Sequence, residues 1–383
     1  MKVLIVGGGV AGLALANLLA QRDIPPTVIE KSDGYGGVGY VLALWPLGTN
    51  QILGMGLRDQ MEQLIAPYDQ YAALTSSGDE LQSMSLQVFA PYGITGLLQR
   101  KELMQVLTDG AKQRGIDMKY NLMVEMIEES GENVTVTFSD GSTDVYDLVV
   151  GADGIHSTVR RIVFGDLPLN FSGFVGYAWW LDASDLCTVE GIKEYWGAAK
   201  FFGVYPSKDA VCVFCGFHGP EQTPVPVEER IEHVVSTFSE FKGIVPDILT
   251  GLKLRGKPEE LYYCDYSDIR MEQWHKGRVV LIGDACHAFL PSAGIGASMA
   301  LESATVLAEE LSRTDAKRVQ NAFRLYYKRR KTRCDKAQTD SRRLLKMMFL
   351  SNPILTWARD KLIKSISFET LMGGIIKLHK EPI

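Results

Sequence analysis

The chain has 383 residues, of which 46% are hydrophobic and 22% are charged, and its 40 basic and 46 acidic residues give a net charge of −6. This composition excludes a disordered chain, and the acidic balance argues against a dedicated nucleic-acid-binding protein. Six cysteines are too few for a disulfide scaffold, so we expect a reducing compartment and a cytoplasmic location. No run of 18 or more apolar residues is free of charges and turn signals, which argues against a membrane-spanning helix.

The first 30 residues predict a strand, a glycine-rich turn, a helix and a second strand. The apolar run Val3 to Val6 is typical of a strand buried on both faces, and Thr27 to Ile29 gives a β-branched second strand. Between them a G-x-G-x-x-G motif permits a tight turn, close approach of a pyrophosphate and close packing of the helix, whose N-terminus attracts phosphate. Glu30 can accept hydrogen bonds from ribose, so the segment predicts a dinucleotide site without separating FAD from NAD. The motif glycines are Gly7, Gly9 and Gly12.

Two later segments again combine a buried strand, an acid-containing loop and a helix. The first contains Asp153-Gly154, and the second contains Gly283-Asp284 followed by a P-x-x-G-x-G run over residues 291–296. Asp284 can hold sugar-like hydroxyl groups, and the glycines after it predict a loop that approaches a ligand closely and opens a helix.

With these segments in this order, the chain resembles the single-component FAD-dependent aromatic hydroxylases, the para-hydroxybenzoate and salicylate hydroxylase-like flavoprotein monooxygenases. The resemblance covers about residues 1–345, and Arg100 matches the family's flavin-contacting arginine at a helix start. The matching fingerprints are G-x-G-x-x-G with E-x6-G (Glu30 to Gly37), the Asp153-Gly154 segment, and Gly283-Asp284 with P-x-x-G-x-G after it.

The resemblance implies an α/β fold with a Rossmann-like FAD-binding domain, a β-sheet substrate layer and C-terminal helices. We expect a discontinuous FAD-binding domain over residues 1–72, 101–165 and 271–330. The substrate layer is expected over residues 73–100 and 166–270, and the C-terminal helices over residues 331–383.

The resemblance also implies which residues hold the cofactor. The glycine motif, Glu30, Lys31 and Arg100 would hold the ADP end of FAD, while Asp284 would meet the ribityl and pyrophosphate region. Asp153 is similar to the acid that family members link to both FAD and NAD(P)H binding. The residues expected to bind the cofactor are Gly7, Gly9, Ala11, Gly12, Glu30, Lys31, Arg100, Val124, Asp153, Asp284, Gly294, Ile295, Gly296, Ala297 and Ser298.

The sequence also departs from the family pattern. Cys286 stands where the family usually has alanine, and Ile295 where it often has glutamine or leucine. Neither removes a group that the flavin needs. The catalytic polar residues of the phenol- and urate-hydroxylating members cannot be matched, so no catalytic residue is assigned and the substrate is not named. No metal site is expected.

Residues 171–217 are dense in aromatic side chains, and the alternation in Val211 to Phe217 predicts strands. These rings either form the core of a sheet, or the inward face of that sheet covers the flavin and builds an apolar cavity. Glu194 is a further polar candidate, and a bulky, mostly apolar or polycyclic substrate fits this composition best. The expected substrate contacts are Tyr177, Trp179, Lys200, Phe202, Phe214 and Pro291.

Residues 313–346 hold 13 Lys/Arg and 3 Asp/Glu, which predicts a solvated helix face. An apolar stripe after it predicts that the C-terminal helices pack on the preceding domain. Basic and apolar residues together are also typical of a helix at a membrane surface, an alternative that we do not favour. The stripe consists of Leu344, Leu345, Met348, Ile354, Leu355, Leu362 and Ile363.

The family resemblance therefore implies an FAD-dependent monooxygenase that uses NADH or NADPH and O2. It would hydroxylate or epoxidise an aromatic or polycyclic small molecule through a C4a-hydroperoxyflavin, which the protein must keep dry. The alternatives are a reductase or halogenase of the same fold, or a non-catalytic flavin-fold lipid carrier. Trp179-Trp180 does not supply the halogenase W-x-W-x-I-P motif, and a carrier would not need Asp153-Gly154. We expect no nucleic-acid partner and either a monomer or a homodimer.

Overall fold

The computed structural model describes residues 1–34, 39–66, 68–182, 190–208, 210–367, 370, 372–381 and 383. A six-stranded sheet forms where the sequence has short apolar runs, and its neighbours β7-β2-β1-β11-β18 are all parallel. Only the edge strand β17 runs antiparallel within this sheet. All four residues of β1 are buried, which explains why its sequence does not alternate. The strands are, in spatial order, β17 (His275–Lys276), β18 (Val279–Leu281), β11 (Leu148–Gly151), β1 (Val3–Val6), β2 (Thr27–Ile29) and β7 (Asp117–Lys119).

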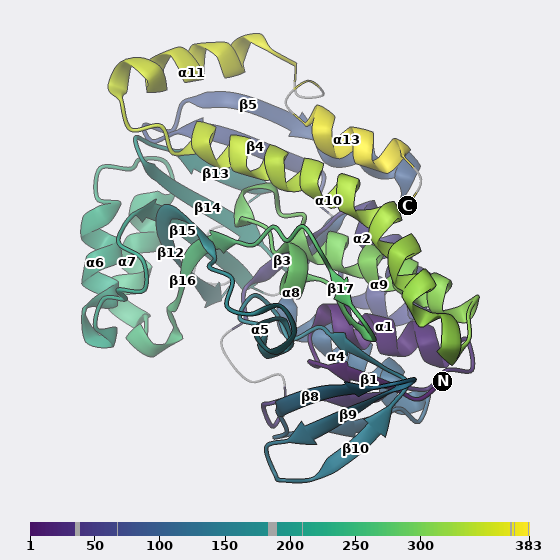
Figure 1. Cartoon of the computed structure of the whole chain (residues 1–383). Coiled ribbons are helices and arrows are strands. Elements are labelled where there is room, and N and C mark those ends of the chain that lie inside the picture. The colour runs from purple at the N-terminus through teal and green to yellow at the C-terminus, as the bar shows by residue number, and fades with distance from the viewer. Residues whose placement is uncertain are drawn as a thin grey trace.

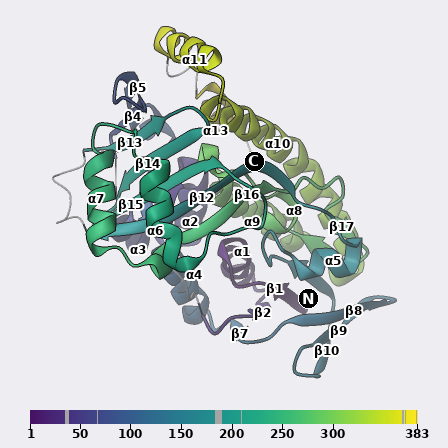
Figure 2. The ribbon, with the colours of Figure 1, turned by 90° about the vertical axis from the view of Figure 1, so that its left-hand side faces the viewer.

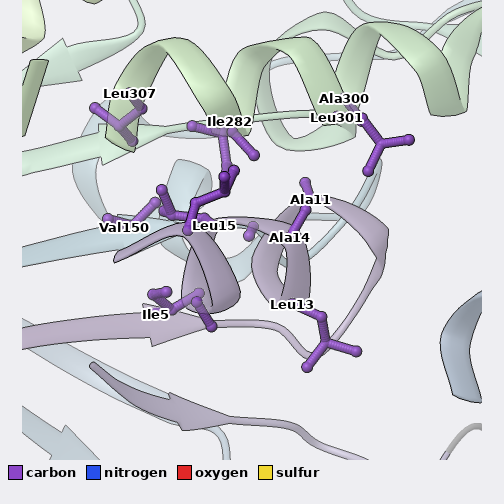
Figure 3. Packing of buried hydrophobic residues seen from close by; sticks show 14 of the residues in the cluster. Ile5, Ala11, Leu13, Ala14, Leu15, Val150, Ile282, Ala300, Leu301 and Leu307 are labelled. Atoms are coloured by element: carbon purple, nitrogen blue, oxygen red, sulfur yellow. The ribbon is translucent and has the colours of Figure 1, made fainter. Parts of the chain in front are cut away.

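Helix α1 (Val10–Ala20) lies between this sheet and helix α9 (Gly296–Ser312), and Figure 3 shows their apolar side chains in contact. A Cβ atom on Gly12 would lie 2.0 Å from the Gly7 carbonyl oxygen, so only glycine allows α1 to start this close to the strand. The other helices of this half are α2 (Pro46–Gly54), α3 (Arg58–Leu64), α4 (Arg100–Gln113), α5 (Thr158–Phe164) and α8 (Asp284–His287).

Two smaller sheets complete this half. A three-stranded antiparallel sheet projects at the bottom of Figure 1, and a two-stranded ribbon borders the space between the two large sheets. The first contains β8 (Val124–Ser130), β9 (Asn133–Phe138) and β10 (Thr143–Tyr146), and the second β3 (Val41–Leu44) and β6 (Gly96–Gln99).

A seven-stranded sheet forms the second layer. Helices α6 (Arg230–Thr237) and α7 (Val245–Arg255) cover one of its faces, on the left of Figure 1 and facing the viewer in Figure 2. The opposite face packs on the end of α10 and on α11. In spatial order the strands are β16 (Tyr262–Asp268), β12 (Asn170–Asp182), β15 (Ala210–His218), β14 (Lys200–Pro206), β13 (Ile192–Trp196), β4 (Gln70–Thr75) and β5 (Glu80–Ser85).

The C-terminal helices are α10 (Val319–Met348), α11 (Pro353–Ser365) and α13 (Gly373–Lys380). Leu345, Met348 and Ile363 are buried, as the apolar stripe predicts. The prediction is wrong for the other face of α11, where Ile354, Leu355 and Leu362 are 75%, 54% and 59% exposed. Helical spacing placed these residues near one another, but α11 lies at the edge of the molecule, and only one of its faces meets the sheet.

Within the described part of the chain, no helix is long and apolar enough to cross a membrane. The α/β fold class predicted from the sequence is confirmed, whereas the exact domain limits stay a prediction.

Short 3₁₀ helices connect the elements: η1 (Leu86–Tyr92), η3 (Val227–Glu229), η4 (Pro258–Glu260), η5 (Pro291–Ala293) and η6 (Ala316–Arg318).

Candidate functional site

A cavity of about 650 Å³ lies between the six-stranded and seven-stranded sheets. Residues at the carboxyl ends of β1, β2 and β11 line it on one side, where open α/β sheets usually bind their ligands. Residues of β4, β13, β14, β15 and β16 line it on the other. The cavity therefore joins the glycine-motif region to the aromatic region of the sequence.

The glycine-rich turn opens the N-terminus of α1 towards this cavity. Gly7 has a φ of 110°, and Gly9 is the N-cap of the helix, with no side chain capping the first turn. A Cβ on Gly9 would meet nothing within 4 Å, so a ligand can approach the backbone here. Unpaired N–H groups at a helix start, together with the helix dipole, suit a pyrophosphate.

Glu30 holds the turn in place. Its Oε2 accepts a hydrogen bond from the Gly8 N–H at 2.8 Å, and its Oε1 accepts from the Ser32 N–H and hydroxyl at 3.0 and 2.8 Å. The side chain still lines the cavity, where its remaining lone pair can accept a ribose hydroxyl. Glu30 therefore both shapes the phosphate turn and presents a sugar acceptor.

Asp284 enters the cavity at the start of α8, directly after Gly283, whose φ is 60°. Burial raises the pKa of Asp284 to about 6, and the nearby positive charge of Arg100 offsets part of this rise. Both side chains line the cavity, and Arg100 begins α4. A carboxyl group with this partner is suited to accept hydroxyl groups of a bound sugar or ribityl chain.

The loop before α9 approaches the cavity with its backbone. Gly294 has a φ of 57° in the left-handed region, and α9 begins at Gly296. Nearby in the same lining, Trp45 Nε1 and Thr95 Oγ1 are buried without a hydrogen-bond partner. Buried polar atoms are normally paired, so these two fit a polar ligand in the cavity. Together with the α1 turn, Glu30, Asp284 and Arg100, these hydrogen-bond donors and acceptors fit FAD.

Asp153 accepts hydrogen bonds from the first turn of α5, a role that the sequence did not reveal. Its Oδ1 accepts from the Ser157 hydroxyl at 2.5 Å, and its Oδ2 accepts from the backbone N–H groups of Thr158 and Val159 at 2.7 and 3.1 Å. Burial raises the pKa of Asp153, and these hydrogen bonds lower it. The residue also lines the cavity, so it fixes the Asp-Gly loop against the ligand space.

The structure brings almost all of the predicted cofactor residues to one cavity, although cofactor contact itself stays a prediction. Gly12 and Ser298 do not line it: Gly12 packs on Gly7, and the buried Ser298 hydroxyl accepts a hydrogen bond from the Trp45 N–H at 3.4 Å. Gly37 of the E-x6-G fingerprint lies outside the described residues. The predicted residues that line the cavity are Gly7, Gly9, Ala11, Glu30, Lys31, Arg100, Val124, Asp153, Asp284, Gly294, Ile295, Gly296 and Ala297.

Four of the six predicted substrate contacts do not line the cavity, because their side chains lie on the opposite face of the seven-stranded sheet. Tyr177, Trp179 and Phe202 pack in the core beneath α6 and α7. Lys200 also points to that side, where its Nζ donates to the Thr237 carbonyl oxygen at 2.7 Å and to Glu240 Oε1 at 2.6 Å. Successive strand residues face opposite sides, and Phe201, which lies between Lys200 and Phe202 on β14, lines the cavity instead.

Two predicted substrate residues, Phe214 and Pro291, do line the cavity, as does the polar candidate Glu194. Sequence reasoning missed the hydroxyl partners of Glu194, which come from other strands. It also missed the end of α10, for which the sequence predicts packing on the preceding domain rather than contact with the cavity. No local motif marks either group. The missed lining residues include Tyr71, Tyr205, Tyr266, Leu344, Leu345, Met348 and Phe349.

Known proteins that are similar to this chain also point to an FAD site. The family model described as "FAD binding domain" matches residues 1–341. A 2-heptyl-3-hydroxy-4(1H)-quinolone synthase of Pseudomonas aeruginosa is 31% identical over 317 residues, which is 80% of each chain. The FAD-dependent monooxygenase asqG of Emericella nidulans is 26% identical and covers 97% of this chain and 72% of its own. Klebsiella pneumoniae HpxO, solved with FAD and uric acid, has a TM-score of 0.90 at 24% identity, covering 99% of this chain and 97% of its own.

Proposed function

The chain belongs to the FAD-binding flavoprotein monooxygenases, and from that premise we propose that it uses NADH or NADPH and O2 to hydroxylate or epoxidise a bulky, mostly apolar or aromatic molecule. The observation that carries this proposal is the single cavity that joins the dinucleotide turn to the aromatic face of the seven-stranded sheet. A cofactor and an organic substrate can therefore share one space between the two sheets.

Bound FAD would supply the redox chemistry, namely reduction by a nicotinamide and activation of O2 for transfer of one oxygen atom. The residues that would hold it are those of the α1 turn, Glu30, Arg100, Asp284 and the loop before α9. Their task is to bind and orient the cofactor, because the helix starts and carboxylates provide fixed donors and acceptors.

The aromatic side of the cavity supports the second half of the proposal. Phe201, Phe214 and Tyr266 from the sheet face Leu345 and Phe349 from the end of α10. This lining suits an apolar ring system, and it limits the access of water to the reacting atoms. The quinolone named for one relative has a bulky, largely apolar chemistry of this kind.

The test uses purified, FAD-loaded protein with NADH or NADPH, ¹⁸O2 and a panel of aromatic and alkyl-substituted heterocyclic compounds. A monooxygenase should consume the nicotinamide faster in the presence of a substrate and should place one ¹⁸O atom in the product, as measured by mass spectrometry. Nicotinamide oxidation with a reduced, unlabelled product would instead indicate a reductase. Ligand binding with neither nicotinamide oxidation nor labelling would indicate a carrier.

A further inference from the structure

We infer that Glu194 is a specificity-determining residue that accepts a hydrogen bond from an N–H or O–H group on a neutral aromatic ring and excludes aromatic carboxylates. This inference rests on the proposed function, because it narrows the substrate class of the same cavity. It concerns binding, and no step of the reaction is assigned to the carboxylate.

The carboxylate of Glu194 is held by three donors inside the cavity lining. Its Oε2 accepts from the Tyr71 hydroxyl at 2.7 Å and from Trp196 Nε1 at 3.3 Å. Its Oε1 accepts from the Tyr205 hydroxyl at 2.8 Å. A carboxylate has about four acceptor sites, so one position on Oε1 stays available for a ligand.

The surrounding elements fix this carboxylate in one orientation. Tyr71, Glu194 and Tyr205 come from the adjacent strands β4, β13 and β14, and all three line the cavity. Burial raises the pKa of Glu194 above its ordinary value, and the hydrogen bonds from its three donors offset part of this rise. Three donors arranged around both oxygens stabilise the ionised form, which is a strong acceptor.

The charges around the cavity argue against an acidic substrate at this position. Among the described lining residues, the lysine and arginine side chains are Lys31 and Arg100, which come from the dinucleotide half. Arg359 packs over the Trp196 ring, but it is paired with Asp360 at 2.7 Å and does not line the cavity. A substrate carboxylate beside Glu194 would therefore place two like charges together with no lining cation on this side.

The test measures ligand binding to the oxidised, FAD-loaded enzyme through the absorbance change of the flavin, with four matched probes. The probes are 2-naphthol, 2-naphthylamine, 2-methoxynaphthalene and 2-naphthoate. We expect 2-naphthol and 2-naphthylamine to bind about 10- to 150-fold more tightly than 2-methoxynaphthalene, the range expected for a hydrogen bond to a charged acceptor. 2-Naphthoate should bind most weakly.

Glu194→Gln should abolish the preference for the donor-bearing probes over 2-methoxynaphthalene and should improve the binding of 2-naphthoate. Glu232→Gln is the matched control, because it makes the same change on α6, which covers the opposite face of the same sheet, and it should bind all four probes like the wild type. Should Glu194→Gln not fold, Glu194→Asp keeps the charge but withdraws it by one methylene. That variant should lose affinity for 2-naphthol and still exclude 2-naphthoate.

Equal binding of 2-naphthol and 2-methoxynaphthalene by the wild type would overturn the inference. So would tight binding of 2-naphthoate, or a folded Glu194→Gln variant with an unchanged preference. Flavin content is measured for each variant, and ¹⁸O labelling is scored separately. A correct probe preference without oxygen transfer would therefore contradict the proposed function and leave the role of Glu194 standing.

Discussion

The carboxylate of Glu302 joins α9, which carries the glycine loop beside the cavity, to α10. It accepts hydrogen bonds from Arg330 Nη1 at 2.6 Å and from Arg333 Nε and Nη2 at 3.0 and 2.8 Å. Glu302 and Arg330 are fully buried, and the side chain of Arg333 is only 6% exposed. One carboxylate thus neutralises part of the charge of two buried guanidinium groups.

We expect Glu302→Gln to lower the free energy of unfolding by about 3–5 kcal/mol, the usual cost of leaving a buried charge without its partner. The amide keeps the size of the side chain but leaves both arginines without an anion at this position. A loss of this size is a large part of a total stability of ~5–15 kcal/mol. The variant should therefore unfold at clearly lower urea concentration and should retain less FAD.

The measurement is urea unfolding of flavin-free protein, followed by tryptophan fluorescence, with Glu309→Gln as the control. Glu309 lies on the same helix and accepts from Arg329 Nη2 at 2.8 Å, but these side chains are 28% and 26% exposed. Breaking this outer pair should cost less than about 1 kcal/mol. Equal effects of the two substitutions would show that burial does not control the energy of these ion pairs, and would refute the reasoning.

The other predictions concern the cofactor half and the last helices. Glu30→Ala should weaken FAD binding about 10- to 150-fold, the cost of a lost hydrogen bond to a charged group, and an unchanged Kd in a fluorescence titration would remove Glu30 from the ribose site. Asp284→Ala should lose more flavin on gel filtration than Asp153→Ala, which should instead raise the KM for NAD(P)H; equal flavin loss with unchanged KM would contradict this assignment. The pKa of Asp284 is raised from 3.8 to about 6 in the folded protein, so its stabilising contribution is present at low pH and is lost as the pH rises through 6. The flavin-free Asp284→Asn variant should thus gain stability relative to the wild type between pH 4 and 7, and melting curves that stay parallel would exclude this linkage. Ile363→Ala, at 0% exposure, should cost about 2–5 kcal/mol, whereas Leu362→Ala next to it, at 59% exposure, should cost less than about 0.5 kcal/mol in the same denaturation assay.

The cofactor half could be predicted from the sequence because its determinants are local. The turn from β1 into α1 needs glycine where φ is positive at Gly7 and where α1 packs against the Gly7 carbonyl oxygen at Gly12. Because these required glycines lie close together in the chain, they can be recognised in the sequence as one short motif. Asp284 follows the same logic, since it lies between the buried strand β18 and the helix α8, and the loop at Gly294 directly precedes the start of α9.

The substrate half could be predicted as a sheet, but not by face. Along β14, Phe202 packs beneath α6 and α7 while the preceding residue, Phe201, lines the cavity, but both faces of this sheet are apolar. The face that meets the cavity is decided by α6 and α7, which follow later in the chain and cover the other side. A sequence pattern of period two separates the two faces of a strand, but it does not show which face the later helices cover.

The sequence also does not reveal which polar side chains meet in the cavity. Glu194 stands out in the sequence as an acid among aromatic residues, yet its two tyrosine partners lie 123 positions before it and 11 positions after it. Only the parallel pairing of β13 with β4 brings Tyr71 beside this carboxylate. A cofactor shared by a family leaves a continuous motif, because its phosphates and sugars demand the same backbone turns in every member. A substrate is recognised by side chains that the sheet brings together from distant segments. The chemistry of the substrate site can therefore be inferred only once the register of the strands is known.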